Sequence, residues 1–268
     1  MDTINTLPQY EPERLERSPI VLAVAQIIFP AILSIQTDDK LTAQFQERIR
    51  GLYPLLSVGH QVEFSLSLGG IQQQELPNRS FQFTDSEQRW TITLSANSLS
   101  LETRHYTDVN EFVERLLTVV TAAKESFGLS VRERVGLRYI NEIRHPEANT
   151  PAAWRPLIRS ELLGPLADDH IAHNIVSASQ QLSFEMPEGR LTLHHGYIPQ
   201  GTTVGTIPET KPPEGPFYLL DLDAFDDKGR EIDNEVLDRL FRGYNRIIYS
   251  LFRWGIRESL FEYLKGSE

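Results

Sequence analysis

The stretch Val131-Arg-Glu-Arg-Val-Gly-Leu-Arg-Tyr-Ile-Asn-Glu-Ile143 alternates between two kinds of side chain with a period of two residues. Such a period predicts a β-strand, because successive side chains of a strand point to opposite faces of its sheet. Asn141 falls on the apolar face, where a buried amide needs hydrogen-bond partners. The predicted polar face carries Arg132, Arg134, Gly136 and Arg138.

Two explanations fit this row of arginines. The strand predicted for Phe217–Phe225 carries Asp221 and Asp223, which could form cross-strand ion pairs with the arginines. The arginines and Asn141 could instead form a secondary binding surface for an anionic partner. Ion pairs of this kind are common on solvated sheet faces, so the pairing explanation is favoured.

Upstream of this strand the pattern changes several times. The run Ile20–Phe29 is rich in β-branched residues and lies between two prolines, which predicts a buried strand. Helical spacing from Leu41 to Leu52 predicts a helix that ends before a proline. A period of two between residues 60 and 105 predicts four antiparallel strands. Helical spacing returns from Asp108 to Phe127, and Gly128 is the expected C-cap.

Downstream, the same order of elements is repeated. Val176–Met186 and Arg190–Tyr197 predict a hairpin, followed by the strand Phe217–Phe225 and a helix from Asp233 to Trp254 or beyond. Between them, Pro199–Pro216 holds five prolines and three glycines, which favours a mobile loop or a lid.

These elements predict an α+β fold, with antiparallel strands covered on one face by long amphipathic helices and a degenerate two-fold internal repeat. The predicted parts are a flexible N-terminal arm over residues 1–18, a first half over 19–147 and a second half over 148–268. The two halves are expected to form one compact domain.

Composition excludes several classes of protein. The 268 residues include no cysteine, which excludes disulfides, thiolate nucleophiles and thiolate-bound metals. No apolar run is long enough to span a bilayer, and residues 1–18 lack the apolar segment of a signal peptide. A cytoplasmic protein without membrane contact is therefore expected. The net charge of −11 disfavours extensive wrapping of nucleic acid.

The predicted last long helix carries a second row of arginines, with no acidic residue among them. On a continuous helix they would lie within an arc of about 60°. They could form a solvated face that complements the helix C-terminus, or a site for an anionic partner, because arginine grips carboxylates and phosphates with two hydrogen bonds. These residues, which we call the helix stripe, are Arg239, Arg242, Arg246, Arg253 and Arg257.

Candidate catalytic and metal-binding groups are few. Asp221 and Asp223 share one face of their predicted strand and could hold a divalent cation, although further ligands are missing. His170 and His173 lack an assignable third ligand, and the adjacent His194 and His195 would point to opposite faces of a strand. No phosphate-binding glycine loop or hydrolase motif is present in the sequence. We therefore predict no catalytic residue, no metal and no cofactor.

Three segments together carry a family resemblance: Ser18-Pro-Ile20 before a strand that ends in Phe29-Pro30, the string Arg134-Val-Gly-Leu-Arg-Tyr-Ile-Asn141, and Leu219-Leu-Asp-Leu-Asp223 before an amphipathic helix. Over nearly its whole length the chain resembles a sporadically distributed family of uncharacterised bacterial and archaeal proteins. Glu142 departs from the basic residue expected there. The resemblance implies no activity and no catalytic residue. The scattered distribution is similar to that of defence and toxin–antitoxin genes, which favours a role in binding a partner.

The function predicted first is that of a non-enzymatic interaction protein. It would be the regulatory or neutralising partner in a two-gene defence or toxin–antitoxin module, and would bind the protein encoded by the neighbouring gene. One alternative is a nucleic-acid-binding protein that uses the helix stripe. Another is a metal-dependent hydrolase or nuclease built on Asp221 and Asp223.

Overall fold

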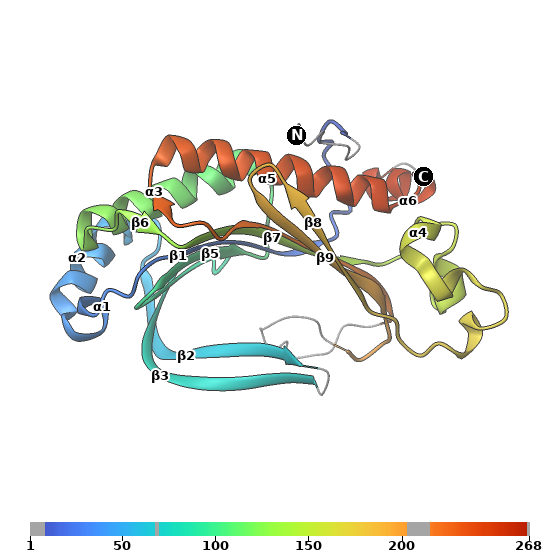
Figure 1. Ribbon diagram of the computed structural model, residues 1–268, viewed down its shortest axis with the longest axis horizontal. Helices are drawn as coiled ribbons and strands as arrows, with labels where there is room; N and C mark the ends of the chain where they lie inside the picture. Colours follow the sequence, from blue (N-terminus) through green and yellow to red (C-terminus); the bar gives the residue numbers. More distant parts are fainter. Residues whose placement is uncertain (1–8, 68–69, 203–214, 267–268) are drawn as a thin grey trace. The chain divides into compact units, whose positions relative to one another are not determined.

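The computed structural model describes residues 9–67, 70–202 and 215–266 (Figure 1). Most of the predicted loop Pro199–Pro216 lies outside the described residues. The strands are β1 (Ile20–Ile28), β2 (Leu55–Ser67), β3 (Gly70–Thr84), β4 (Trp90–Ser95), β5 (Ser98–Thr103), β6 (Val131–Arg132), β7 (Arg134–Ile143), β8 (Gln180–Met186), β9 (Gly189–Ile198), β10 (Phe217–Asp226) and β11 (Arg230–Glu231). The α-helices are α1 (Ser34–Thr37), α2 (Asp39–Ile49), α3 (Val109–Phe127), α4 (Ser160–Leu163), α5 (Asn234–Gly255) and α6 (Glu258–Lys265), and the 3₁₀ turns are η1 (Pro151–Trp154), η2 (Gly164–Ala167) and η3 (Ala172–Asn174).

Nine strands form a large antiparallel sheet in the order β2-β3-β4-β5-β1-β7-β10-β9-β8, and β6 pairs with β11 in a small second sheet. The four antiparallel strands predicted between residues 60 and 105 are confirmed as β2 to β5, which pair in succession. The predicted hairpin of the second half is also present, as β8 and β9. The mixed fold with a large antiparallel sheet is thus confirmed.

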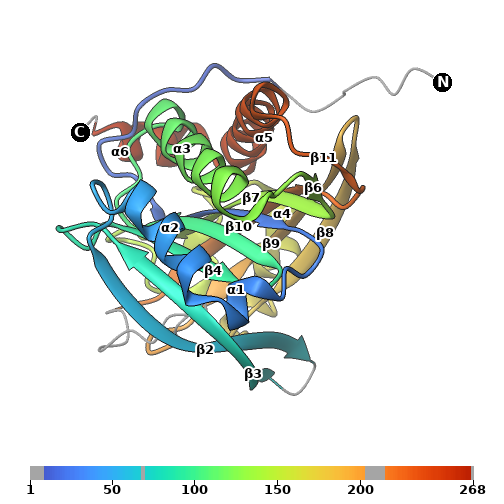
Figure 2. The same ribbon diagram turned by 90° about the vertical axis from the view of Figure 1, so that its left-hand side faces the viewer.

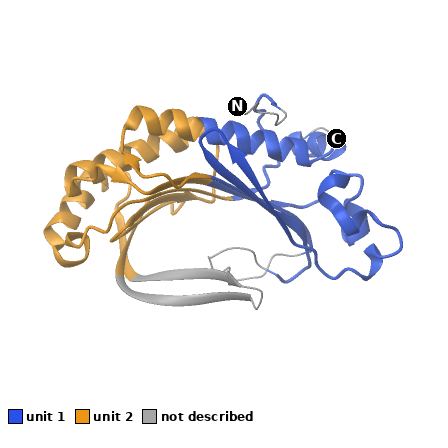
Figure 3. Ribbon diagram, in the orientation of Figure 1, with its two compact units in different colours: residues 1–21, 138–224, 243–268 blue, residues 22–137, 225–242 orange. Residues whose placement is uncertain are grey.

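The chain forms two compact units (Figure 3). Unit 1 contains residues 1–21, 138–224 and 243–268, and unit 2 contains residues 22–137 and 225–242. Both units are discontinuous in sequence, and β1, β7, β10 and α5 contribute residues to both. The units therefore do not coincide with the sequence halves 19–147 and 148–268.

In unit 2, α2 and α3 pack on the same face of the sheet (Figure 2). Phe45 of α2 contacts Phe83 of β3 with ring centres 5.4 Å apart, and Phe112 of α3 contacts Trp90 of β4 at 5.6 Å. The ends of α3 follow from its sequence. The Asp108 side chain accepts hydrogen bonds from two backbone N–H groups of the first turn, and Gly128 ends the helix with a φ of 67°. The predicted helix over 108–127 is confirmed.

In unit 1, residues of the predicted N-terminal arm contact the C-terminal helices. The backbone N–H of Tyr10 donates to the Ser250 hydroxyl, and that of Glu13 donates to the Tyr249 hydroxyl. The Arg17 guanidinium donates to the Tyr263 carbonyl at 2.6 Å. Residues 10–17 are therefore held against α5 and α6 by specific hydrogen bonds.

One predicted strand and the predicted helix stripe differ from the structure. The strand predicted over Val131–Ile143 is interrupted at Glu133, whose N–H donates to the Ile28 carbonyl, and the two residues before it pair with β11 instead. The predicted long helix is confirmed as α5, but it ends at Gly255, and Ile256 forms an isolated bridge with Ile158 before α6 begins, so the helix stripe is not continuous. Arg257 is the N-cap of α6 and does not belong to α5. Among the described residues, no helix is long and apolar enough to cross a membrane.

Candidate interaction surfaces

Arg138 and Asp221 form a cross-strand pair in unit 1. The guanidinium donates through Nε and Nη2 to the two carboxylate oxygens, at 2.7 and 2.6 Å. The hydrogen bonds to Asp221 raise the pKa of Arg138. The expected ion pair is therefore confirmed for these two residues. Because both Asp221 oxygens are taken up by this pair, the carboxylate is already satisfied without a metal ion.

The two polar residues on the other face of β7 also have partners within unit 1. Asn141 is buried, and its Nδ2 donates to the Leu220 carbonyl at 2.9 Å. Tyr139 donates its hydroxyl hydrogen to Asn245 of α5 at 3.0 Å. The predicted need of a buried Asn141 for hydrogen-bond partners is confirmed. Its contacts fix the strand to its neighbours within the core.

Arg132 is the residue of the strand pattern that differs most from expectation. The pattern places it beside Arg134 and Arg138 on a polar face, but it is buried in unit 2 and only 1% exposed. Its guanidinium donates to the buried Asp226 at 3.0 Å and to the Lys228 carbonyl at 3.4 Å. The break at Glu133 places Arg132 on β6, outside the alternation of β7. Its guanidinium therefore forms hydrogen bonds inside unit 2 and is not part of the polar face.

Arg134 lies on the polar face and is fixed there by three neighbours. A Cβ atom on Gly136 would lie 3.0 Å from Nη1 of Arg134, so any larger residue at position 136 would displace the guanidinium from its present place over the strand. The guanidinium carbon lies 4.7 Å from the centre of the Phe225 ring. Nη1 also donates to Gln26 of β1 at 3.3 Å. The guanidinium of Arg134 thus lies close to the strand, over the glycine of the Arg-Val-Gly-Leu-Arg string.

The sheet of unit 2 has one apolar face and one polar face. Leu99 and Leu101 of β5 are fully buried, together with Ile92 and Leu94 of β4. The alternate residues are partly exposed and mostly carry hydroxyl or amide groups, and neighbouring strands place them side by side. This set, which we call the polar face, comprises Gln26, Gln82, Thr84, Thr91, Thr93, Ser98, Ser100, Glu102 and Arg134.

Glu102 is the only carboxylate of the polar face. It lies opposite Val24 on β1 and Thr91 on β4. Burial raises its pKa, although the charge of Arg104 acts in the opposite direction. Glu102 forms no hydrogen bond or ion pair with another described residue. It is thus a desolvated carboxylate without a matched donor.

The part of the helix stripe that lies in unit 2 comprises Arg239 and Arg242. Arg242 donates to both carboxylate oxygens of Asp238 at 2.9 Å and to Asn110 of α3 at 2.6 Å, so it joins α5 to α3. Arg239 is exposed and forms no hydrogen bond or ion pair with a described residue.

The helix-stripe residues that lie in unit 1 are Arg246, Arg253 and Arg257, and two of them have partners within the unit. The Arg253 guanidinium lies 3.9 Å from the centre of the Phe261 ring and pairs with Glu258. Arg257 donates to the Ile158 carbonyl at 3.0 Å. Arg246 is exposed and forms no hydrogen bond or ion pair with a described residue. Three arginines of the helix stripe therefore contact other residues of the chain: Arg242, Arg253 and Arg257. The other two, Arg239 and Arg246, face solvent.

The described histidines do not assemble with other metal-binding side chains. Among the described residues no group of three metal-binding side chains is present. His195 is buried and lies 3.1 Å from the Tyr218 hydroxyl, which donates to the Leu162 carbonyl. Burial lowers the pKa of His195 to about 4, so its ring is neutral. His194 lies 2.6 Å from the hydroxyl of Ser179.

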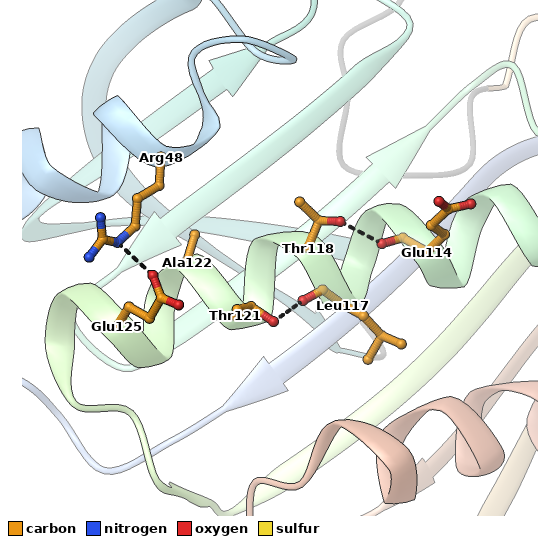
Figure 4. Close-up of a pocket in the computed structure, with 7 residues that line it drawn as sticks. All are labelled: Arg48, Glu114, Leu117, Thr118, Thr121, Ala122 and Glu125. Atoms are coloured by element: carbon orange, nitrogen blue, oxygen red, sulfur yellow. Dashed lines mark hydrogen bonds and ion pairs between the residues drawn. The ribbon is translucent and has the colours of Figure 1, made fainter.

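A shallow depression of about 580 Å³ lies beside α3 (Figure 4). Arg48 of α2 and Glu125 of α3 form an ion pair of 3.1 Å on its wall. The hydroxyls of Thr118 and Thr121 donate to carbonyls of the preceding helical turn. These polar groups already have partners within unit 2, and the depression contains no arrangement of an acid, a base and a nucleophile.

No protein-family model matches this chain, and no curated protein matches it. The polar face was not identified from the sequence, although the alternation of Trp90–Ser95 and Ser98–Thr103 contains the signal for it. That Glu102 has no hydrogen bond or ion pair within the described part of the chain can be seen only in the three-dimensional structure.

Proposed function

We propose that this chain is a non-enzymatic interaction protein that binds a basic protein partner on the polar face of unit 2. One observation carries the proposal: Glu102 is a partly buried carboxylate with no hydrogen bond or ion pair to a described residue. A buried charge without a partner costs free energy, which a lysine or arginine of a bound protein would recover.

The surroundings of Glu102 support this assignment. Thr91, Thr93 and Ser100 offer hydroxyl groups that can donate or accept hydrogen bonds at the rim of such a contact. The net charge of −11 would attract a basic partner at long range.

In this proposal the partner is the protein encoded by the neighbouring gene, and the two form a defence or toxin–antitoxin module in the cytoplasm. The present chain would be the neutralising or regulatory component. The predicted duplication of residues 19–147 and 148–268, with helices on one face of the whole sheet, remains part of the same hypothesis.

The test is co-expression of the chain with the neighbouring gene's product, followed by calorimetric titration of the purified proteins. We expect Glu102→Gln to weaken binding by at least about tenfold, because it removes the charge that the partner's cation would pair with. Glu114→Gln, on the exposed side of α3, is the matched control and should leave the affinity unchanged. Equal affinities of the wild-type chain and Glu102→Gln, or no binding at all, would refute the proposal.

Nucleic-acid binding is the second candidate, because Arg239 and Arg246 are exposed without a hydrogen bond or ion pair to a described residue. Each would contact a phosphate, and affinity would fall steeply with added salt. Arg239→Ala and Arg246→Ala should each reduce the salt dependence, whereas Arg242→Ala should act through the loss of its contacts to Asp238 and Asn110. Salt-insensitive binding, or none, rules this candidate out.

A further inference from the structure

The strand β2 is the last strand of the sheet on the side of unit 2, and its pairing partner within the described chain is β3. An edge strand presents N–H and C=O groups that can pair with another strand. Natural proteins usually protect such edges with charged residues, prolines or bulges. The first residues of β2, Leu55-Leu-Ser-Val-Gly59, contain no charge and no proline, and the register shifts only at His60 to Val62.

This segment also exposes apolar side chains. Leu56 is 43% exposed and Val58 is 51% exposed. They pair with Phe83 and Phe81 of β3, which are buried beneath the helices of unit 2. The apolar face of the sheet therefore continues to the edge and ends there with two side chains that are only half covered.

We infer that two copies of this chain associate through their β2 strands, paired antiparallel around a two-fold axis at Ser57. Such an arrangement needs a segment that is complementary to itself about its midpoint. Around Ser57, Leu56 of one copy would lie opposite Val58 of the other, and the reverse pair would form on the opposite side of the axis. Both pairs fall on the apolar face, so each copy would extend the core face of the other.

The lack of charge at the edge permits a second copy as the occupant. The segment holds no ionised group, so the paired strands bring no like charges into contact. The whole chain carries −11, so two copies repel each other at long range. Added salt screens that repulsion and should strengthen the dimer, whereas it should weaken the binding of a basic partner to the polar face. The dimer is therefore independent of the proposed function and can be tested separately.

The chain contains no cysteine, which allows a direct experiment. Residues directly opposite each other in antiparallel strands have Cα atoms within the range that a disulfide can join. We expect Ser57→Cys to form a covalent dimer on mild oxidation of the full-length chain. Ser86→Cys, at an exposed position in the turn between β3 and β4 and away from the sheet edge, is the matched control and should remain monomeric. No covalent dimer from Ser57→Cys, or equal yields from both variants, overturns the inference.

Sedimentation of the full-length chain supplies a second readout. The wild-type chain should dimerise with rising concentration, and more strongly at high salt. Ser57→Lys places two positive charges against each other at the axis and should remain monomeric, with an unchanged melting temperature because Ser57 is exposed. An equimolar mixture of Ser57→Lys and Ser57→Glu should associate again. A wild-type chain that stays monomeric, or a Ser57→Lys variant that dimerises like it, contradicts the proposed register.

Discussion

Two arginine–aspartate pairs join β10 to neighbouring residues, one pair in each unit, and they differ in exposure. In unit 2, the side chains of Arg132 and Asp226 are each 2% exposed. In unit 1, the side chain of Arg138 is 40% exposed, while that of Asp221 is 5% exposed. The same two residue types thus form a fully buried pair in one place and a half-exposed pair in the other.

The comparison shows that burial of each member determines what its removal costs. Taking a charge out of water is expensive, and the attraction between partners compensates for that cost only while both are present. In the buried pair, loss of either residue leaves a charge without water. In the half-exposed pair, loss of Asp221 leaves an arginine that water can still reach, whereas loss of Arg138 leaves a buried carboxylate.

The largest effect is expected from Asp226→Ala, which leaves the Arg132 guanidinium buried and unpaired. We expect a loss of about 3 to 5 kcal/mol in the free energy of unfolding, measured by urea titration. The double variant Arg132→Met with Asp226→Leu should regain most of that loss, because it removes both charges. Arg230→Ala is a control: Arg230 contacts Asp226 at 3.3 Å but is half exposed, so its removal should cost little. A small effect of Asp226→Ala would contradict the comparison.

His195 extends the comparison to a buried titratable group without an opposite charge. Because its pKa falls from 6.5 to about 4 on burial, the unfolded chain binds a proton between these pH values that the folded chain does not. The free energy of unfolding therefore decreases as the pH falls from 6.5 to about 4, and the total decrease is about 3 kcal/mol. Unfolding of His195→Gln, measured over the same pH range, should lack this component. Parallel curves for variant and wild type would refute the assignment.

The half-exposed pair should respond unequally to the loss of its two members. We expect Arg138→Met to cost about 2 kcal/mol, because the Asp221 carboxylate loses both hydrogen bonds inside the protein. Asp221→Asn should cost about 1 kcal/mol less than Arg138→Met, because it removes the buried charge and Arg138 remains partly hydrated. Urea unfolding of both variants gives the difference. Equal costs would mean that exposure of the arginine does not matter here.

The sequence predicted the parts of this comparison that depend on local pattern. The alternation around Arg138 and the acidic residues of Phe217–Phe225 predicted the pairing with Asp221, and the spacing over 108–127 predicted α3 with its caps. The break at Glu133 could not be predicted, since it depends on the Ile28 carbonyl more than a hundred residues away. The burial of Arg132, which follows from this break, could not be predicted from the sequence either.

The candidate surfaces were less predictable than the fold. Helical spacing placed five arginines in one row, but the end of α5 at Gly255 removed Arg257 from it, and contacts to distant residues occupy Arg242 and Arg253. The partner of each arginine is a residue distant in sequence, and the periodicity of the helix does not predict such contacts. Glu102 shows the same limit, because its pattern indicates a strand, and only the fold shows that no described residue donates a hydrogen bond to its carboxylate.

Glu102 completes the comparison as a carboxylate that receives no hydrogen bond from a described arginine, and its substitution should have the smallest effect on stability. Its raised pKa means that the folded chain binds a proton more tightly than the unfolded chain, so its contribution to stability is lost as pH rises through the folded pKa. Glu102→Gln removes the buried charge and should raise the free energy of unfolding by about 0.5 kcal/mol at neutral pH. At acidic pH, where Glu102 is protonated, the variant should be no more stable than the wild-type chain. Urea unfolding at both pH values measures this. A destabilised Glu102→Gln variant would mean that Glu102 already has a partner in the folded chain, whereas a stabilised variant that also loses its protein partner would show that the unpaired carboxylate is kept for binding.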